Sequence, residues 1–169
     1  MVLPKVLMTD VVRSSQQGDS HGGAYLIDLQ RGEYEQVLDW DRIDISWEGR
    51  GQGRGLRGIC FVGDEIFIAA SDELFVFNQS FDILRSYKSD YLHHCHEICY
   101  DGHRYIYLSS TSFDSVLRFD TREERFDRGW WMRPMKLGSG VELRAPVFDP
   151  NEPDGPPHGD HRCRREPWR

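Results

Sequence analysis

The sequence predicts an all-β protein built from repeated antiparallel sheets, and three observations support this prediction. An internal repeat of about 40 residues runs through the middle of the chain. Each copy divides into short apolar runs that are separated by turn residues. Aromatic residues make up 12% of the 169 residues, and many lie in those runs, where their high β propensity favours strands.

The repeat aligns residues 56–69 with residues 95–108 at an offset of 39. The matched pairs are Ile59 with Ile98, Cys60 with Cys99, Phe61 with Tyr100 and Gly63 with Gly102. After a three-residue insertion the register resumes at an offset of 42, which places Phe77 on Phe119. Four short antiparallel strands per repeat of this length are typical of a β-propeller blade.

The two complete copies predict four strands each. We expect strands near residues 57–61, 65–70, 73–78 and 82–87, and again near residues 96–100, 104–109, 115–119 and 125–131. The pairs Gly63-Asp64 and Asp101-Gly102 are turn signals between the first two strands of each copy. An earlier, partial copy supplies strands near residues 5–9, 23–28 and 34–38 and lacks an innermost strand.

These copies predict an open ring: a partial β-propeller of about three blades over residues 1–135, with blades at about 5–40, 56–90 and 95–135. After Trp131 the pattern ends, and we expect residues 136–169 to form a loop and an irregular basic tail. Propellers close with roughly four to eight blades, so three blades leave faces and edges that invite self-association. Two explanations stay open: a truncated N-terminal portion of a larger ring, or a ring that a second chain completes.

Composition narrows the partners and the compartment. The net charge of −7 argues against broad binding to nucleic acid. The N-terminal residues lack the apolar core of a secretory signal, and no apolar run is long enough to span a membrane. We therefore expect a cytoplasmic protein with reduced thiols. Cys60 and Cys99 alternate with large apolar residues, which predicts that both are buried.

The densest group of chemically active residues is the run from His93 to Glu97, at the start of an innermost strand. Innermost strands line the channel of a propeller, so their first residues surround its mouth. If the run is extended, alternation sends His94 and His96 one way and Glu97 the other. The repeat alignment places Arg57 of the preceding blade opposite His96. We therefore predict a ligand-binding site from Arg57, His94, His96 and Glu97.

Three interpretations of this group stay open. In the first, His96 and Glu97 hold adjacent blades together, and Arg57 forms an ion pair with Glu97. In the second, the group binds a small anionic or sugar-like ligand, because an arginine clamps carboxylate or phosphate groups. In the third, His96 and Glu97 hold a divalent metal, although the aligned Arg57 and Gly58 are not metal ligands.

Four segments resemble known propeller families: residues 22–29, 54–59, 71–77 and 91–98. They are similar to six-bladed propellers of the NHL, YVTN and gluconolactonase-like kind, and more closely to a bacterial family of propeller proteins. The resemblance covers about residues 5–160 and implies the fold without implying a reaction. The glycine-rich run 49–55 and the segment 157–161 are interpreted as loops.

We therefore expect a binding or scaffold propeller fragment with a polar channel-mouth site for a small molecule. One alternative is a metal-dependent hydrolase or lyase of the propeller lactonase type, an analogy that rests on the fold. Another is an incomplete chain without independent activity.

Overall fold

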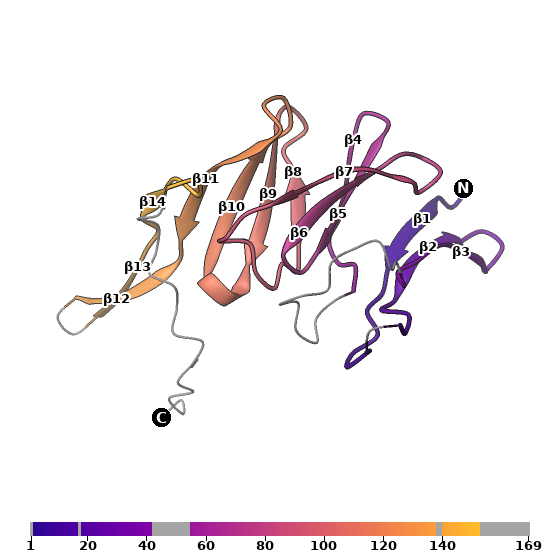
Figure 1. Cartoon of the computed structure of the whole chain (residues 1–169), viewed down its shortest axis with the longest axis horizontal. Helices are drawn as coiled ribbons and strands as arrows, with labels where there is room; N and C mark the ends of the chain where they lie inside the picture. Colours follow the sequence, from indigo (N-terminus) through magenta and orange to yellow (C-terminus); the bar gives the residue numbers. More distant parts are fainter. Residues whose placement is uncertain (1, 17, 42–54, 138–139, 153–169) are drawn as a thin grey trace.

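The computed structural model describes residues 2–16, 18–41, 55–137 and 140–152, with the backbone alone for residues 133–137 and 140–144. Three antiparallel sheets follow one another along the chain (Figure 1). The first contains β1 (Lys5–Thr9), β2 (Gly23–Asp28) and β3 (Glu33–Asp39). The second contains β4 (Ile59–Val62), β5 (Glu65–Ala70), β6 (Glu73–Phe77) and β7 (Ile83–Lys88). The third contains β8 (Ile98–Tyr100), β9 (Tyr105–Ser110), β10 (Ser115–Asp120) and β11 (Arg125–Trp131), with β14 (Val147–Phe148) on its outer edge.

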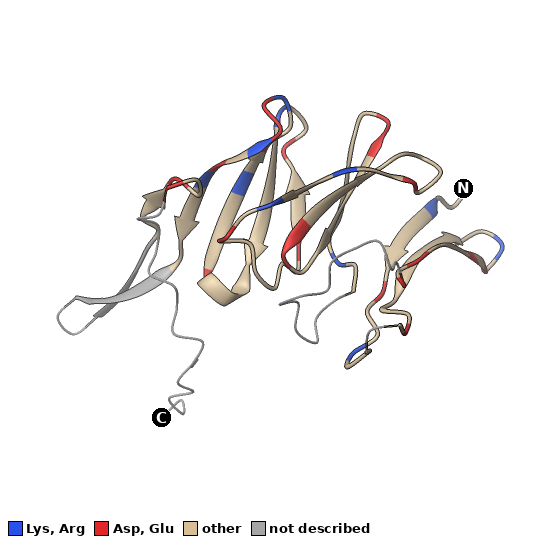
Figure 2. Cartoon of the chain, in the orientation of Figure 1, with Lys and Arg blue, Asp and Glu red and all other residues tan. Residues whose placement is uncertain are grey.

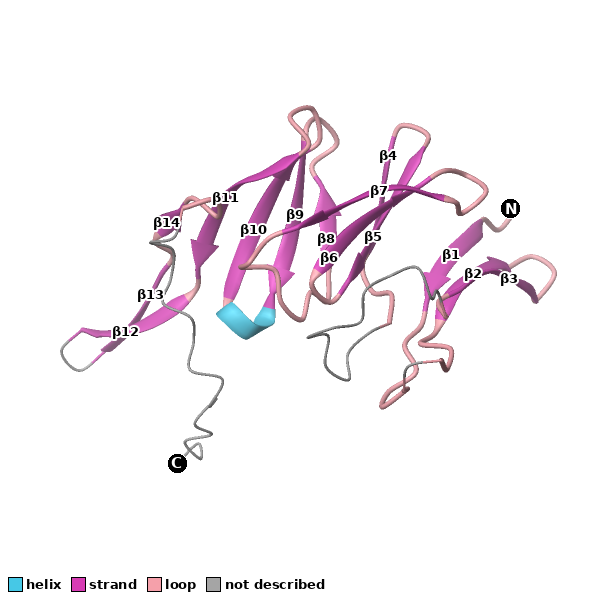
Figure 3. Cartoon of the chain, viewed as in Figure 1, coloured by secondary structure: helices cyan, strands magenta, loops and turns pink. Residues whose placement is uncertain are grey.

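We call these sheets blades 1, 2 and 3. Nearly all regular structure in the described residues is β, and the helix in them is the short 3-10 turn η1 (Thr111–Phe113) (Figure 3). The blades stand side by side in an open arc rather than a closed ring, with the inner strands β4 and β8 in contact (Figure 1). The predicted all-β, open-propeller fold is confirmed. Blade 1 has three strands in the order β1-β2-β3, so β1 is its inner edge among the described residues.

Two apolar cores join the blades, and blade 2 contributes to both. Alternation along β5 sends Ile66 and Ile68 toward blade 1 and Phe67 and Ala69 toward blade 3. Every residue of β6 is buried, which is why this strand is a continuous run of apolar residues after Glu73. Burial on both faces thus makes the middle blade the centre of the described structure.

The three-residue insertion between the two repeat copies divides between two turns. In blade 2, Phe61 pairs with Ile66, whereas in blade 3 Tyr100 pairs with Ile106, so the first turn gains one residue. The second turn lies between Ala70 and Glu73 in blade 2 and between Ser110 and Ser115 in blade 3. It is therefore two residues longer in blade 3. Those two residues make room for η1. The insertion therefore changes loops and leaves the strand pairing intact.

The structure differs from the sequence prediction after residue 135. Instead of a loop, the chain forms a hairpin of β12 (Arg133–Leu137) and β13 (Gly140–Arg144), and then β14 pairs with β11. Phe148 can pack there because residue 129 is glycine: a Cβ at Gly129 would lie 2.3 Å from its ring. The loop and irregular basic tail were predicted over residues 136–169, and the part of this range from 153 to 169 lies outside the described residues, as do residues 49–54 of the glycine-rich run.

The cysteine prediction is half correct. Cys60 is buried between blades 2 and 3, and burial raises the pKa of its thiol to about 12. Cys99 is exposed, contrary to prediction, because β8 is an edge strand whose second face has no sheet against it among the described residues. In the part of the chain that the structure describes, no helix has the length and apolar character needed to cross a membrane.

An ion pair between half-buried Arg104 and buried Asp120 joins the turn before β9 to the end of β10 and gives the fold a predicted acid sensitivity. Both carboxylate oxygens of Asp120 accept hydrogen bonds from Arg104, at 2.9 Å from its Nε. The Arg104 bond and backbone N–H groups lower the pKa of Asp120 to about 2. Its contribution to stability is therefore complete above its ordinary pKa of 3.8 and is lost as the pH falls toward 2.

We expect Asp120→Asn to destabilise the protein at neutral pH. Urea titrations at several pH values should show the free-energy gap between wild type and variant narrowing as the pH falls from about 4 to about 2. A gap that stays constant across this range would contradict the role given to the carboxylate.

Candidate functional site

An open groove lies where the inner ends of the three blades meet. Its volume is about 440 Å³. Blade 1 contributes the end of β1 and the residues that follow it, blade 2 the segment entering β4, and blade 3 the segment entering β8. The polar residues that line the groove are Thr9, Asp10, Arg57, His96 and Glu97. We call this groove the channel-mouth site.

Arg57 and His96 are in direct contact across the junction of blades 2 and 3. Nη1 of Arg57 lies 3.1 Å from Nδ1 of His96. Because a guanidinium only donates, Nδ1 must accept, and the proton of the neutral imidazole is then on Nε2. Burial, followed by the charge of Arg57, lowers the pKa of His96 below its ordinary 6.5. At neutral pH His96 is therefore uncharged, and its Nε2–H remains available as a donor.

The contact differs from the predicted ion pair between Arg57 and Glu97. Both residues are described, and their charged groups form no ion pair within 4.0 Å. The predicted alternation does not separate His96 from Glu97, because both residues line the groove. The reason is local: β8 begins at Ile98, so His96 and Glu97 precede the strand and its alternation.

His94 lies apart from this pair. Its backbone is left-handed, with a φ of 51°, and its Nδ1 lies 2.9 Å from the Oγ of Ser112 beside η1. His94 is not among the residues that line the groove. Of the four predicted site residues, the structure brings together Arg57, His96 and Glu97 and directs the fourth toward the η1 turn.

Backbone hydrogen bonds hold the site residues in place. The Oγ of Ser109 accepts from the backbone N–H groups of His96 and Glu97, at 3.2 and 3.0 Å. The hydroxyl of Thr9 donates to the carbonyl of Arg57 at 2.6 Å and so ties blade 1 to blade 2. A Cβ at Gly58 would lie 2.5 Å from the backbone nitrogen of Ile98. Glycine at this position therefore permits the close approach of the two inner strands.

Sequence reasoning missed Thr9, Asp10 and Ser109. Thr9 is the last residue of β1 and Asp10 follows it, and Ser109 is the penultimate residue of β9. The repeat alignment compares innermost strands with one another, whereas these residues come from other strands. Thr9 and Asp10 are polar residues at the end of an apolar run. This pattern could have identified them if the order of the strands in the sheet had been considered.

The acidic residues of the groove leave the metal prediction untested. Asp10 accepts a hydrogen bond from the backbone N–H of Gly23 at 2.6 Å. The side chain of Glu97 makes no hydrogen bond or ion pair with the residues that the structure describes. Within these residues, no three His, Cys, Asp or Glu side chains are grouped closely enough to hold a metal ion. A metal on His96 and Glu97 therefore stays a prediction.

Arg57 differs from the arginines that pair across the strands of blades 2 and 3. Arg85 pairs with Glu65, Arg104 with Asp120 and Arg118 with Asp127, each at 2.6–2.7 Å. Arg57 has no carboxylate partner within the described part of the chain, and the only hydrogen bond of its side chain there is to His96. The channel-mouth site thus contains a half-buried cation that no carboxylate of the described residues contacts directly.

Comparisons with known proteins give little beyond this geometry. No family model matches the sequence, and no curated protein matches it. Among solved structures, the chain is similar to the WD40 domain of Pan2 from Neurospora crassa, with a TM-score of 0.44 and 12% sequence identity. The similarity covers 76% of this chain and 40% of that chain, so this chain spans less than half of that domain. The evidence for the fold is therefore the strand pairing and packing within the chain itself.

Proposed function

We propose that the channel-mouth site binds a small hydroxylated carboxylate, such as a sugar acid. The observation that carries this proposal is the half-buried guanidinium of Arg57, which lies beside an open groove and has no carboxylate partner among the described residues. Arginine binds carboxylates through charge-assisted, often bidentate hydrogen bonds. A ligand carboxylate would supply the partner that Arg85, Arg104 and Arg118 find within the protein.

The other groove residues favour a ligand with hydroxyl groups. Glu97 lines the groove, and its carboxylate oxygens can accept hydrogen bonds from ligand hydroxyls. The Nε2–H of neutral His96 donates to an oxygen. A simple inorganic anion would use Arg57 and His96 and would be repelled by the carboxylate of Glu97. A molecule with one anionic end and several hydroxyls uses both kinds of group.

We expect isothermal titration calorimetry to show saturable binding of gluconate, with weaker binding of inorganic phosphate and of uncharged glucose. Arg57→Gln should reduce the gluconate affinity about 10- to 100-fold, because a hydrogen bond to a charged group contributes about 1.5–3 kcal/mol. Arg31→Gln is the matched control, since Arg31 is an exposed arginine at the far end of blade 1 that pairs with Glu33. Equal affinity in wild type and Arg57→Gln, or no saturable binding, would refute the proposal.

A further inference from the structure

The two ends of the arc each present a sheet face with no partner sheet among the described residues. Blade 1 packs one face on blade 2, and blade 3 packs one face on the opposite side of blade 2. The second face of blade 1 and the second face of blade 3 remain uncovered in the described structure. We call them the blade 1 outer face and the blade 3 outer face.

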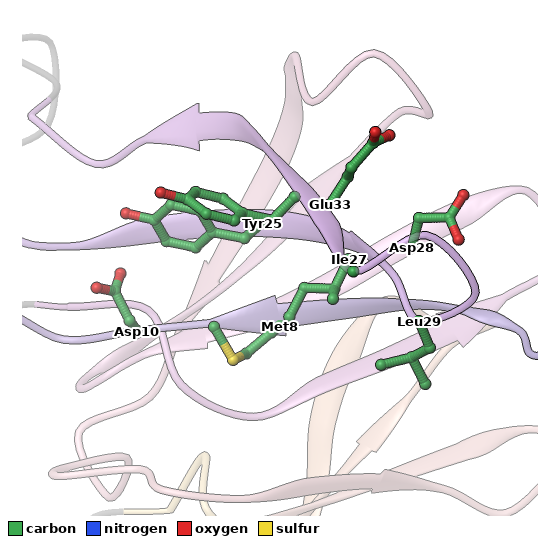
Figure 4. Close-up of a pocket in the computed structure, with 9 residues that line it drawn as sticks. Met8, Asp10, Tyr25, Ile27, Asp28, Leu29 and Glu33 are labelled. Atoms are coloured by element: carbon green, nitrogen blue, oxygen red, sulfur yellow. The ribbon is translucent and has the colours of Figure 1, made fainter.

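The blade 1 outer face is an apolar groove with acidic ends (Figure 4). The groove has a volume of about 360 Å³, and its apolar lining includes Met8, Ile27 and Tyr34. Met8 is 45% exposed and Tyr34 75% exposed, although both are large side chains on a sheet face. In Figure 4, Met8 and Ile27 lie between the carboxylate of Asp10 at one end and that of Asp28 at the other.

The blade 3 outer face is aromatic and carries two arginines, of which Arg118 pairs with Asp127. The guanidinium of Arg118 lies 4.1 Å from the ring centre of Tyr105 and 5.9 Å from that of Trp130. Trp130 in turn contacts Tyr107, with ring centres 5.9 Å apart. Figure 2 shows basic residues on β10 and β11, whereas acidic residues predominate along blade 1. Exposed Arg128 is opposite Arg118 in the strand pairing, and it adds a positive charge to this face.

The two outer faces complement each other in chemistry. Tryptophan, tyrosine and arginine are the residues that contribute most to protein interfaces, and an apolar groove with carboxylates at its ends is a surface that suits them. The same kind of contact, sheet face against sheet face, already joins blade 1 to blade 2 and blade 2 to blade 3. A third contact between outer faces would therefore repeat the packing that holds the chain together.

We propose that the partner of these faces is a second copy of this chain, bound with its blade 3 outer face on the blade 1 outer face of the first. Because the two faces differ, the contact is head-to-tail. The ring closes if the blade 1 outer face of the second copy also binds the blade 3 outer face of the first. Two copies then form a ring of six blades, which lies within the range of about four to eight found in propellers. This inference is independent of the ligand proposed for the channel-mouth site.

Two variants that each disable one face test the head-to-tail contact. Tyr34→Arg places a cation in the blade 1 outer face, and Val116→Glu places an anion beside Trp130 in the blade 3 outer face. By light scattering after size exclusion, we expect the wild type to have twice the monomer mass and each variant alone to be monomeric. An equal mixture should recover a dimer, because Tyr34→Arg retains a normal blade 3 face and Val116→Glu a normal blade 1 face.

The mixture also controls for misfolding, since recovery requires that both variants are folded. Leu84→Arg is a further control, because Leu84 is 48% exposed on β7, at the outer edge of blade 2 and away from both faces; it should remain dimeric. A wild type that stays monomeric across the micromolar range would overturn the proposal. Dimers that persist in either single variant would also overturn it, because they would show that the outer faces are not the contact.

Discussion

Gly58→Ala is expected to damage the fold and the channel-mouth site together. The added Cβ would lie 2.5 Å from the nitrogen of Ile98 and 2.9 Å from the Cα of Glu97. Both atoms belong to the backbone, so no side-chain rotation relieves the clash, and β8 must move away from β4. Overpacking of this kind costs about 1–3 kcal/mol. The movement would also separate His96 from Arg57, because the two residues flank this contact.

Urea unfolding and gluconate titration of the same preparation would measure both effects. We expect a lower free energy of unfolding together with a loss of affinity of at least about tenfold, which corresponds to about 1.4 kcal/mol. Gly63→Asn is the matched control: Gly63 has a φ of 59°, a Cβ there meets nothing within 4 Å, and asparagine tolerates this conformation. A Gly58→Ala protein with wild-type stability would show that the inner strands are less closely packed than described.

Trp40→Ala is expected to have the largest effect on stability. Trp40 is fully buried between blades 1 and 2, where its ring centre lies 5.0 Å from that of Phe75 and 6.2 Å from that of Phe77. Removal of a buried tryptophan costs about 3–5 kcal/mol. This loss is a large fraction of the total free energy of unfolding of a domain, which is about 5–15 kcal/mol. Because Trp40 follows β3 directly, blade 1 should separate from blade 2 first.

Hydrogen exchange would show this separation as faster exchange of the β1–β3 amides, with β9 and β10 less affected. Phe61→Ala is the matched control, because Phe61 is 57% exposed and its loss should change the free energy of unfolding by no more than about 0.5 kcal/mol. Uniformly faster exchange in all three blades would contradict the separate packing of blade 1.

The fold was predictable because its information is local and repeated. The repeat of Ile59, Phe61 and Gly63 in Ile98, Tyr100 and Gly102 identified corresponding strands without any knowledge of the packing. The hairpin of β12 and β13 was missed because it has no counterpart in the repeat. It also contains Pro134, which argues against a strand.

The site was predictable in position but less so in detail. Repeat alignment placed Arg57 and His96 at corresponding points of successive blades, and the structure brings them into contact. Alignment could not show which neighbour Arg57 bonds, because this depends on where β8 begins. The contributions of Thr9 and Ser109 depend on contacts between strands that the alignment does not compare.

A titration of protein carrying ¹⁵N-labelled histidine with gluconate tests the ligand proposal most directly, because the ring nitrogens of His96 report on the groove itself. Before addition, we expect a neutral His96 ring at pH 7 with its proton on Nε2. On addition, the signals of His96 should move saturably, and more than those of the other six histidines in the chain. The movement should disappear in Arg57→Gln. Signals of His96 that do not move, or that move equally in Arg57→Gln, would contradict binding of the ligand at the channel-mouth site through Arg57.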